Sequence, residues 1–545
     1  MDIDPYDAIV VGSGATGGMA ALTLAQQGIK VLIIEAGPFI KRENSSSKEP
    51  LDTFRRISSL VTRKHEKQIQ HPGYWKNNPE LYADEKKYPY SFPTKKPFLW
   101  TQGKQVGGRS LTWGGITLRL AADDFNPSSL DGYGPNWPIS YNDLAPHYDY
   151  VEKFCGIYGK SDNLSQIPDG KYKGEFPLTE SEIYFGNQVK TKLNFPFISS
   201  RGFSKNSSVK EKHWPKSSSI GSSIQNALKT GNVQILANHL VESFETNQET
   251  ELATKIKIIN TENGLRSELN CKLIFLCAST ISTLRILLNS KKNVRSDGFN
   301  DPSGKLGRYI MDHVSVCRFF TLPHIETIKS DEKASLSGAG SFFIPFGSKL
   351  PNISKINFLR GYGIWGAINR VGIPTYLKKN KNESIGFLIS HGEVLPRFSN
   401  KVELSSQLDR WEIPIPYIDF EWSENELDMI EHMKKTMKEA ITASGGEIKS
   451  ISNIINFPFT KILDDKSIAL SKNIPPPGYY IHEVGGAQMG SNEENSVTDS
   501  WNRLWRCKNV FVLDGACWPT SSWQSPTLTM MAISRRVCLS IKKLV

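Results

Sequence analysis

The residue with the clearest catalytic chemistry is His482, which lies between a proline-rich stretch at residues 475–478 and the pair Gly485 and Gly486. A histidine can take the proton of a hydroxyl group near neutral pH, because its ordinary pKa lies close to that pH. Loss of that proton lets the carbinol carbon release a hydride to an acceptor that faces it. A single histidine can also be a structural residue with satisfied hydrogen bonds, so both roles are open from the residue alone.

A glycine-rich loop near the N-terminus indicates a nucleotide-binding site. Gly12, Gly14 and Gly17 form the pattern GxGxxG after a strand-like run at residues 8–11, and a helical stretch at residues 19–27 follows. Glu35 ends the next predicted strand, 18 positions after Gly17, and dinucleotide-binding folds place an acidic residue at a spacing of about 20.

Each residue of this motif has its own expected role. Gly12 permits a tight turn, Gly14 lets the backbone approach a pyrophosphate, and Gly17 lets the helix pack closely on the sheet. The helix N-terminus stabilises the phosphate charge, and Glu35 accepts hydrogen bonds from ribose hydroxyls. A carboxylate at this position favours FAD or NAD over NADP. The alternative is a glycine-rich turn that binds no ligand.

A second glycine-rich element spans residues 103–115 and carries one large aromatic residue, Trp113. Its small residues leave backbone amides free to lie against an extended cofactor. Taken alone, the segment could equally be an ordinary loop.

The elements that must position these residues include buried strands. Short apolar runs at residues 231–236 and 271–276 are typical of parallel strands that are covered on both faces. Residues 314–475 are less regular, and alternate polar and apolar side chains at 401–404 and 416–420.

One long helix and two loops complete this pattern. Residues 424–444 predict an amphipathic helix that ends at Gly445 and Gly446. The lysine- and serine-rich residues 40–67 and the charged residues 329–333 predict mobile surface loops near a site entrance.

In their order along the chain, these segments resemble the glucose–methanol–choline (GMC) family of FAD oxidoreductases, and within it the branch of pyranose oxidases and sugar-acid dehydrogenases. The matching segments are residues 12–18 with Glu35, 103–115, 137–144, 303–313, 482–490, 509–516 and 526–529. The resemblance implies an α/β (α+β overall) fold, with a Rossmann-like FAD-binding domain and a second, antiparallel-sheet substrate domain. It assigns residues 1–150, 215–313 and 475–545 to a discontinuous FAD-binding domain, and residues 151–214 and 314–474 to the substrate-binding domain.

The resemblance implies an enzyme that oxidises a CH–OH group by proton abstraction and hydride transfer to flavin N5. His482 matches the family's catalytic base.

The second polar residue of the family, His or Asn, falls at Ser525, with Gln524 beside it. A serine hydroxyl can bond a substrate oxygen, but it is shorter than asparagine and cannot act as a histidine would. Gln524 or another side chain compensates, the substrate is held differently, or the activity is weak. Ser525 could instead begin a helix as its N-cap.

The resemblance also assigns the surroundings of the cofactor. Thr112 stands where some relatives carry a histidine that links FAD covalently, so we expect FAD to be non-covalent. Trp113 either stacks near the isoalloxazine or fills core volume. The helix that Pro526 and Thr527 begin is expected to stabilise charge on the reduced flavin. The expected cofactor-binding residues are Gly12, Gly14, Ala15, Thr16, Gly17, Glu35, Gly107, Gly108, Ser110, Thr112, Trp113, Gly114, Val241, Asp514, Gly515, Ala516, Pro526 and Thr527.

The expected substrate is a sugar, a polyol or a related alcohol, which the family branch alone implies. The alternatives are a sterol or aliphatic alcohol, repurposed flavin chemistry such as a lyase or photochemical decarboxylase reaction, and a non-catalytic FAD-binding protein. The electron acceptor is open between oxygen, a quinone and a carrier protein.

Composition limits the other classes of function. The 545 residues are 39% hydrophobic and 22% charged, as in folded multi-domain proteins. The net charge of +11 is dispersed and lies on no nucleic-acid-binding module, and we expect no transmembrane segment.

The seven cysteines show no CxxC pair, which favours reduced thiols over disulfides or a metal site. A strand begins almost at Met1, which leaves no room for a signal peptide. We therefore expect a cytoplasmic protein.

Overall fold

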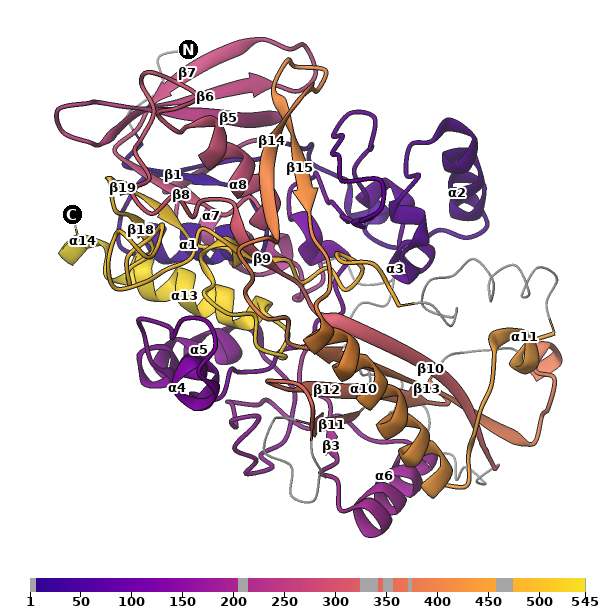
Figure 1. Ribbon diagram of the computed structural model, residues 1–545. Helices are drawn as coiled ribbons and strands as arrows, with labels where there is room; N and C mark the ends of the chain where they lie inside the picture. The colour runs from indigo at the N-terminus through magenta and orange to yellow at the C-terminus, as the bar shows by residue number, and fades with distance from the viewer. Residues whose placement is uncertain are drawn as a thin grey trace.

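The computed structural model describes residues 6–203, 214–323, 342–346, 356–370, 375–456 and 474–544. These residues form a largely parallel sheet, a large antiparallel sheet and two smaller antiparallel sheets (Figure 1). The α/β fold that the sequence predicts, with one parallel and one antiparallel layer, is confirmed.

The parallel sheet is built from the short apolar runs of the sequence. Its strands lie in the order β18-β19-β8-β1-β2-β4, with β18 antiparallel to β19 and the others parallel. Every residue of β1, β2 and β8 is buried, as expected for strands at the centre of a covered sheet. The bounds are β1 Ala8–Val11, β2 Val31–Ile34, β4 Val233–Leu236, β8 Leu273–Leu276, β18 Arg503–Leu504 and β19 Cys507–Val512.

Two helices from opposite ends of the chain pack together against this sheet. α1 (Ala15–Ala25) begins directly after the glycine-rich loop and is buried along almost its whole length. α13 (Thr527–Leu539) lies beside α1 (Figure 1). The N-terminal and C-terminal motifs of the sequence therefore lie close together.

The large antiparallel sheet has the strand order β16-β10-β13-β12-β11-β3. Its strands are β3 Ile198–Ser199, β10 Val314–Pro323, β11 Phe342–Phe346, β12 Tyr362–Ile368, β13 Glu383–Gly392 and β16 Glu447–Ile448. The sequence pattern of residues 314–475 is irregular, but the described part of that region is mostly regular sheet and helix, in agreement with the predicted antiparallel sheet. Alternation is weak here because both faces of the sheet carry large apolar side chains.

α10 (Glu424–Ala443) covers one face of the antiparallel sheet (Figure 1). Ser423 caps its N-terminus through a capping box with Glu426, which satisfies free backbone N–H groups there. Met429, Met433 and Met437 are buried on the face that packs against β10 and β13. The predicted helix at residues 424–444 is confirmed to within one residue.

A hairpin inside the expected substrate domain lies with the other half of the molecule. β14 (Lys401–Leu408) and β15 (Pro414–Asp419) join β9 (Arg308–Met311) and β17 (Val484–Gly486) in the sheet order β15-β14-β9-β17. Both hairpin strands contact α8 (Thr280–Asn289). Residues 401–419 thus pack with the elements expected to bind FAD, whereas the predicted division places them in the substrate domain.

The remaining elements surround these layers. β5 (His239–Thr246), β6 (Ala253–Asn260) and β7 (Arg266–Asn270) form a three-stranded antiparallel sheet. The other α-helices are α2 Leu51–Thr62, α3 Pro72–Lys76, α4 Pro127–Asp131, α5 Tyr141–Cys155, α6 Glu180–Leu193, α7 Ser223–Leu228, α11 Ile451–Ile454 and α14 Ile541–Leu544.

The prediction of a surface loop over residues 40–67 is wrong in part. α2 occupies residues 51–62 of this segment, with polar side chains buried on one face. The sequence signal was misleading, because the buried face of α2 is the polar one. The other predicted loop, residues 329–333, lies outside the described residues.

Among the described helices, none combines the length and the apolar character that a membrane span requires.

Candidate active site

A cavity of about 1660 Å³ lies between the parallel sheet and the antiparallel sheet. At one end it is lined by the glycine-rich loop and Glu35, and at the other end by His482, Ser525 and one face of the antiparallel sheet. In open α/β sheets, ligands bind at the carboxyl ends of the parallel strands. β1, β2 and β8 each end at this cavity.

The three motif glycines have three different environments. Gly12 has φ +98°, and a Cβ atom there would lie 2.4 Å from the Cys277 carbonyl oxygen. A Cβ on Gly17 would lie 2.0 Å from the Gly12 carbonyl oxygen, so Gly17 serves close packing and does not line the cavity. A Cβ on Gly14 would meet nothing within 4 Å, and Gly14 lines the cavity at the start of α1. This open backbone has the form that a pyrophosphate requires.

Glu35 lies at the end of β2, where its carboxylate holds the loop in place. Oε2 accepts hydrogen bonds from the Ser13 backbone N–H at 3.1 Å and the Ser13 hydroxyl at 2.6 Å, and Oε1 accepts from the Gly37 N–H at 3.1 Å. Burial raises the pKa of Glu35 above its ordinary value. Lys104 also lines this end of the cavity, and burial lowers its pKa to about 8.

The second glycine-rich segment lies directly on the first. The Gly107 N–H donates to the Ser13 hydroxyl at 2.9 Å, and the Ser110 hydroxyl donates to the Gly107 carbonyl at 2.5 Å. Gly108, Ser110, Thr112, Trp113 and Gly114 line the cavity, whereas Gly107 lies behind it. The two segments therefore form one continuous wall. The sequence alone does not show that they are in contact.

Trp113 is fixed by contacts outside the cavity although it lines the wall. Its indole N–H donates to the Ser217 carbonyl at 2.9 Å, and its ring meets Phe203 edge-on at 5.5 Å. Thr112 lies next to it, with its hydroxyl 3.3 Å from the Arg109 carbonyl. Both predicted roles of Trp113, stacking near the isoalloxazine and filling core volume, are compatible with this position.

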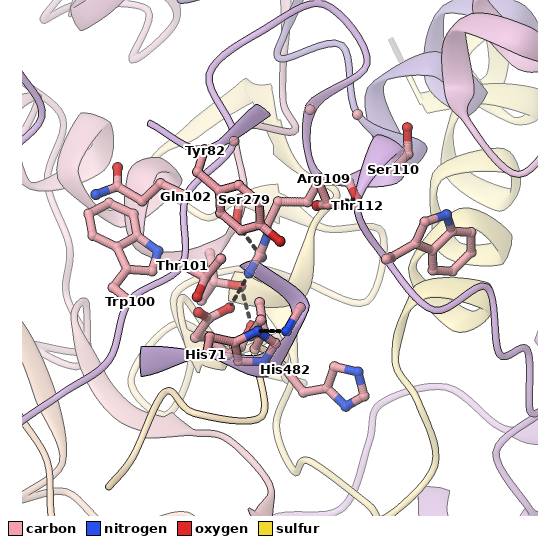
Figure 2. A pocket seen from close by; sticks show the side chains of 18 of the residues that line it. His71, Tyr82, Trp100, Thr101, Gln102, Arg109, Ser110, Thr112, Ser279 and His482 are labelled. Carbon is pink, nitrogen blue, oxygen red and sulfur yellow. Dashed lines mark hydrogen bonds and ion pairs between the residues drawn. The ribbon is translucent and has the colours of Figure 1, made fainter. Parts of the chain in front are cut away.

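An ion pair at the centre of the cavity was missed in the sequence. Arg109 donates to the Glu483 carboxylate at 2.8 Å and to the Ser279 hydroxyl at 2.7 Å. Figure 2 shows Arg109 reaching toward Ser279 from the segment that carries Ser110 and Thr112. Arg109 lies within a motif that matched the family and Glu483 follows His482, but the sequence does not show that the two side chains meet.

The C-terminal motif completes the cofactor end. Asp514 accepts hydrogen bonds from the Thr283 hydroxyl at 2.5 Å and from the Ala516 N–H at 3.0 Å. Asp514 and Gly515 line the cavity, as do Val241, Pro526 and Thr527. Ala516 does not line it, and its carbonyl instead accepts from the Ala487 N–H at 2.8 Å.

His482 lies at the other end of the cavity, on a backbone that Asp312 holds. The two carboxylate oxygens of Asp312 accept from the His482 N–H at 2.9 Å and from the Gly478 N–H at 2.8 Å. Asp312 is fully buried, and burial raises its pKa to about 7. The chain before His482 is thereby tied to the end of β9.

A second histidine orients the imidazole of His482. His313 Nε2 lies 2.8 Å from the Ser522 carbonyl oxygen, which can only accept, so this nitrogen carries the hydrogen. His313 Nδ1 is then an acceptor in the neutral ring and receives a hydrogen bond from His482 Nδ1 at 2.8 Å. The His482 Nε2 atom is left without a proton, as a base requires.

The surroundings keep these rings neutral. Burial lowers the pKa of His313 to about 3, and burial with the neighbouring His313 and His391 rings lowers the pKa of His482 well below its ordinary value. His391 is a fully buried histidine beside them, with its ring stacked on Tyr480 at 5.1 Å and Nδ1 2.6 Å from the Trp523 carbonyl. The sequence contains His313 within a matching motif but gives no sign that these rings cluster.

Ser525 and Gln524 point in different directions. Ser525 lines the cavity, and the N-cap residue of α13 is Pro526, with no side-chain capping bond. Ser525 is therefore not the N-cap. Gln524 is absent from the cavity wall: its side-chain amide donates to Asp124 at 2.7 Å and to the Gln166 carbonyl at 3.3 Å. Of the two residues expected to orient the substrate, Ser525 lines the cavity and Gln524 is bonded outside it.

One face of the antiparallel sheet forms the wall opposite the loops. Alternate residues of β10, β12 and β13 point into the cavity, as the period of a strand requires. They are Ser315, Cys317, Phe319, Trp365, Ala367, Phe387 and Ile389. Most of these side chains are apolar, and the Trp365 N–H is already bonded to the Tyr480 hydroxyl at 2.8 Å.

The cofactor end of this cavity fits a flavin dinucleotide. It offers the open N-terminus of α1 at Gly14 for phosphate, the Glu35 carboxylate at the end of β2, and the Lys104 side chain beside the strand ends. A fold and a site of this kind are typical of dinucleotide-dependent oxidoreductases, and comparisons with known proteins identify the cofactor and the family.

A family profile described as GMC oxidoreductase matches residues 396–534, and one described as FAD binding domain matches residues 7–48. The 2-methyl-1,2-propanediol dehydrogenase of Mycolicibacterium austroafricanum is 26% identical, over 98% of this chain and 94% of its own length. The fructose dehydrogenase large subunit of Gluconobacter japonicus is 23% identical, over 98% of this chain and 97% of its own.

Solved structures share the fold. A pyridoxine 4-oxidase from Mesorbium loti superposes with a TM-score of 0.59 and an FAD-dependent oxidoreductase from Chaetomium thermophilum with 0.64, each at 15% identity over 99% of both chains. The chain belongs to the GMC oxidoreductases and is an FAD-dependent enzyme of that family.

Proposed function

We propose that this enzyme oxidises the hydroxyl group of a small alcohol with a largely apolar carbon body, and that His482 is the general base. The observation that carries the proposal is the chain from the Ser522 carbonyl through His313 to His482. This chain leaves the His482 Nε2 atom unprotonated beside the cavity, where a substrate hydroxyl can donate to it. FAD, when bound, supplies the acceptor for the hydride.

The remaining roles follow from position. Ser525 also lines the cavity and can donate a hydrogen bond to the substrate oxygen, in place of the family's His or Asn. The apolar face formed by Phe319, Trp365 and Phe387 excludes water from the carbinol carbon and packs against the body of the substrate. Arg109, Glu35 and the open backbone at Gly14 hold the cofactor.

The substrate class rests on the chemistry of this wall and on one relative. A sugar carries several hydroxyl groups, and each hydroxyl that is buried on binding needs a hydrogen-bond partner in the protein to replace water. The wall offers few such partners, whereas the relative named as a 2-methyl-1,2-propanediol dehydrogenase takes a short branched diol. Sugars are the second candidate, which the relatives named as fructose dehydrogenase and paromamine 6'-oxidase favour.

Three further features belong to this proposal. FAD is bound non-covalently, since Thr112 offers no ring nitrogen to form the bond. The FAD-binding part consists of residues 1–150, 215–313 and 475–545, together with the hairpin at residues 401–419. The protein works in the cytoplasm, which its seven cysteines support because all of them are free.

An anaerobic reduction screen tests the proposed function. The purified yellow protein is mixed with branched diols, aliphatic alcohols, sugars and sterols, and flavin bleaching is followed at about 450 nm. We expect the diols and short alcohols to bleach the flavin fastest. Bleaching by sugars alone would select the second candidate, and a flavin that no alcohol bleaches would contradict alcohol oxidation. Acid precipitation of the protein should leave all the yellow colour in solution if FAD is non-covalent.

A further inference from the structure

The helix α2 turns its apolar face to solvent. Phe54 is 70% exposed, Ile57 53% and Val61 83%, and Leu51 at the start of the helix is 48% exposed. These side chains recur at spacings of three and four residues, so they form one stripe along the helix. Figure 1 shows α2 at the periphery of the molecule, away from the two main sheets.

The opposite face of α2 is polar and buried. Asp52 is fully buried, Arg56 is 2% exposed and Ser59 6%. Arg56 donates to the Tyr74 carbonyl at 3.3 Å and the Asn77 carbonyl at 2.8 Å, and it pairs with Glu49 at 2.6 Å. This inverted arrangement is held by specific hydrogen bonds, so the helix cannot rotate to bury its apolar stripe without losing them.

The size of the stripe limits what can cover it. A helix of 12 residues is about 18 Å long, and one stripe of four side chains presents only a few hundred Å². A stable protein interface needs about 800 Å² on each partner. The stripe is therefore too small for a second copy of this chain, but it has the form of a helix that lies in a membrane interface.

Charge favours the same occupant. Residues 41–67 contain eight Lys or Arg and four Asp or Glu; Arg56 is buried, whereas Lys41, Lys48 and Arg63 are exposed, and the whole chain carries a net charge of +11. Basic residues beside an apolar helix face attract the anionic headgroups of a bilayer.

The helix also borders the cavity. Thr53 of α2 and Trp75 of α3 both line it, and Trp75 is 47% exposed. We propose that α2 docks on the surface of an anionic phospholipid bilayer, with Leu51, Phe54, Ile57 and Val61 at the headgroup boundary and the cavity mouth next to the lipid. This proposal does not depend on the reaction proposed above.

Vesicle flotation of the FAD-loaded full chain tests the proposal. Vesicles of phosphatidylcholine with phosphatidylglycerol are compared with vesicles of phosphatidylcholine alone. The wild type is compared with the double variant Phe54→Ser/Val61→Ser and with the control Leu265→Ser, whose 67% exposed leucine lies in the turn between β6 and β7. Flavin absorbance and thermal melting check that each variant is folded. If the double variant does not fold, the single variant Phe54→Ser is used in its place.

We expect the wild type and Leu265→Ser to float with the anionic vesicles, and the double variant to partition at least about tenfold less. Flotation with the neutral vesicles should be weaker than with the anionic ones. The proposal is overturned if the wild type does not float with anionic vesicles, or if the double variant floats equally well. Sedimentation velocity without lipid tests the alternative of a dimer. If the wild type is a dimer and Phe54→Ser/Val61→Ser is a monomer, the stripe binds a second copy of this chain and the proposal is contradicted.

Discussion

The two ends of the cavity are built in different ways. The cofactor end is made of backbone: Gly12, Gly14 and the segment around Gly108 shape it, and Glu35 fixes it through N–H groups of neighbouring residues. The substrate end is made of side chains from strands far apart in the chain, with His313 and His482 as its polar centre. The glycine-rich loop and Glu35 of the first end are set by local sequence, whereas the polar centre of the second end is set by the tertiary fold.

This difference predicts that the two ends can be damaged separately. A change at the substrate end should slow the reduction of bound flavin while the FAD content stays normal. A change at the cofactor end should lower FAD retention while the flavin that stays bound is reduced at a normal rate.

The largest effect is expected for His482→Ala. Loss of the base should slow flavin reduction by at least about a hundredfold, the lower end of what general-base catalysis contributes. Anaerobic stopped-flow absorbance measures the rate, and the FAD-to-protein ratio should match the wild type. His432→Ala is the control, because His432 bonds Tyr362 on the far side of the antiparallel sheet. A rate for His482→Ala within a fewfold of the wild type would remove the base from the account.

Two variants of His313 at the substrate end distinguish its role in orienting His482 from a role in packing alone. His313→Leu removes the acceptor for the His482 Nδ1–H, so the ring of His482 is free to change tautomer, and we expect reduction to slow by about tenfold or more. His313→Asn keeps an acceptor oxygen near the position of Nδ1 and should recover most of the rate. Equal rates for the two variants would show that His313 acts only as packing.

The third effect concerns the apolar wall. Phe387 faces the cavity and meets Trp365 edge-on at 5.4 Å. Phe387→Ser should lower kcat/KM for an alcohol with an apolar body by about tenfold, the size of a lost hydrophobic contact in a substrate pocket. Steady-state kinetics with a diol and with a sugar measure the shift in preference. An unchanged ratio between the two substrates would contradict the proposed contact.

The smallest effect is expected at the cofactor end. Glu35→Gln replaces a charged acceptor by a neutral one of the same shape, so FAD should bind about threefold to tenfold more weakly. Dialysis followed by absorbance measures the flavin retained. Glu85→Gln is the matched control, since the Glu85 carboxylate is also buried and accepts backbone N–H groups, of Lys67 and Gln68, away from the cavity. Normal retention in Glu35→Gln, or equal loss in the control, would contradict the role of Glu35.

The comparison also explains what could be predicted from the sequence. The motif glycines, Glu35 and the strands beside them were predictable because their roles depend on residues within one βαβ unit. The contact between His313 and His482 was not, since it requires the end of β9 to meet a loop some 169 positions later. The position of Gln524 outside the cavity was not predictable either, because sequence adjacency to Ser525 does not give the direction of a side chain. The helix α2 was not predictable, because its sequence pattern does not reveal that the polar face is the buried one.

The central claim is that His482 is a neutral base whose tautomer His313 fixes. The most direct test is the pH dependence of the rate of anaerobic flavin reduction by a saturating alcohol, in the wild type and in His313→Leu. Because burial holds the pKa of His482 well below its ordinary value, the base stays unprotonated as pH falls through the usual histidine range. We predict a wild-type rate that is level from about pH 9 down to about pH 6. A wild-type rate that falls below about pH 6.5, where an unperturbed histidine gains its proton, would contradict the account.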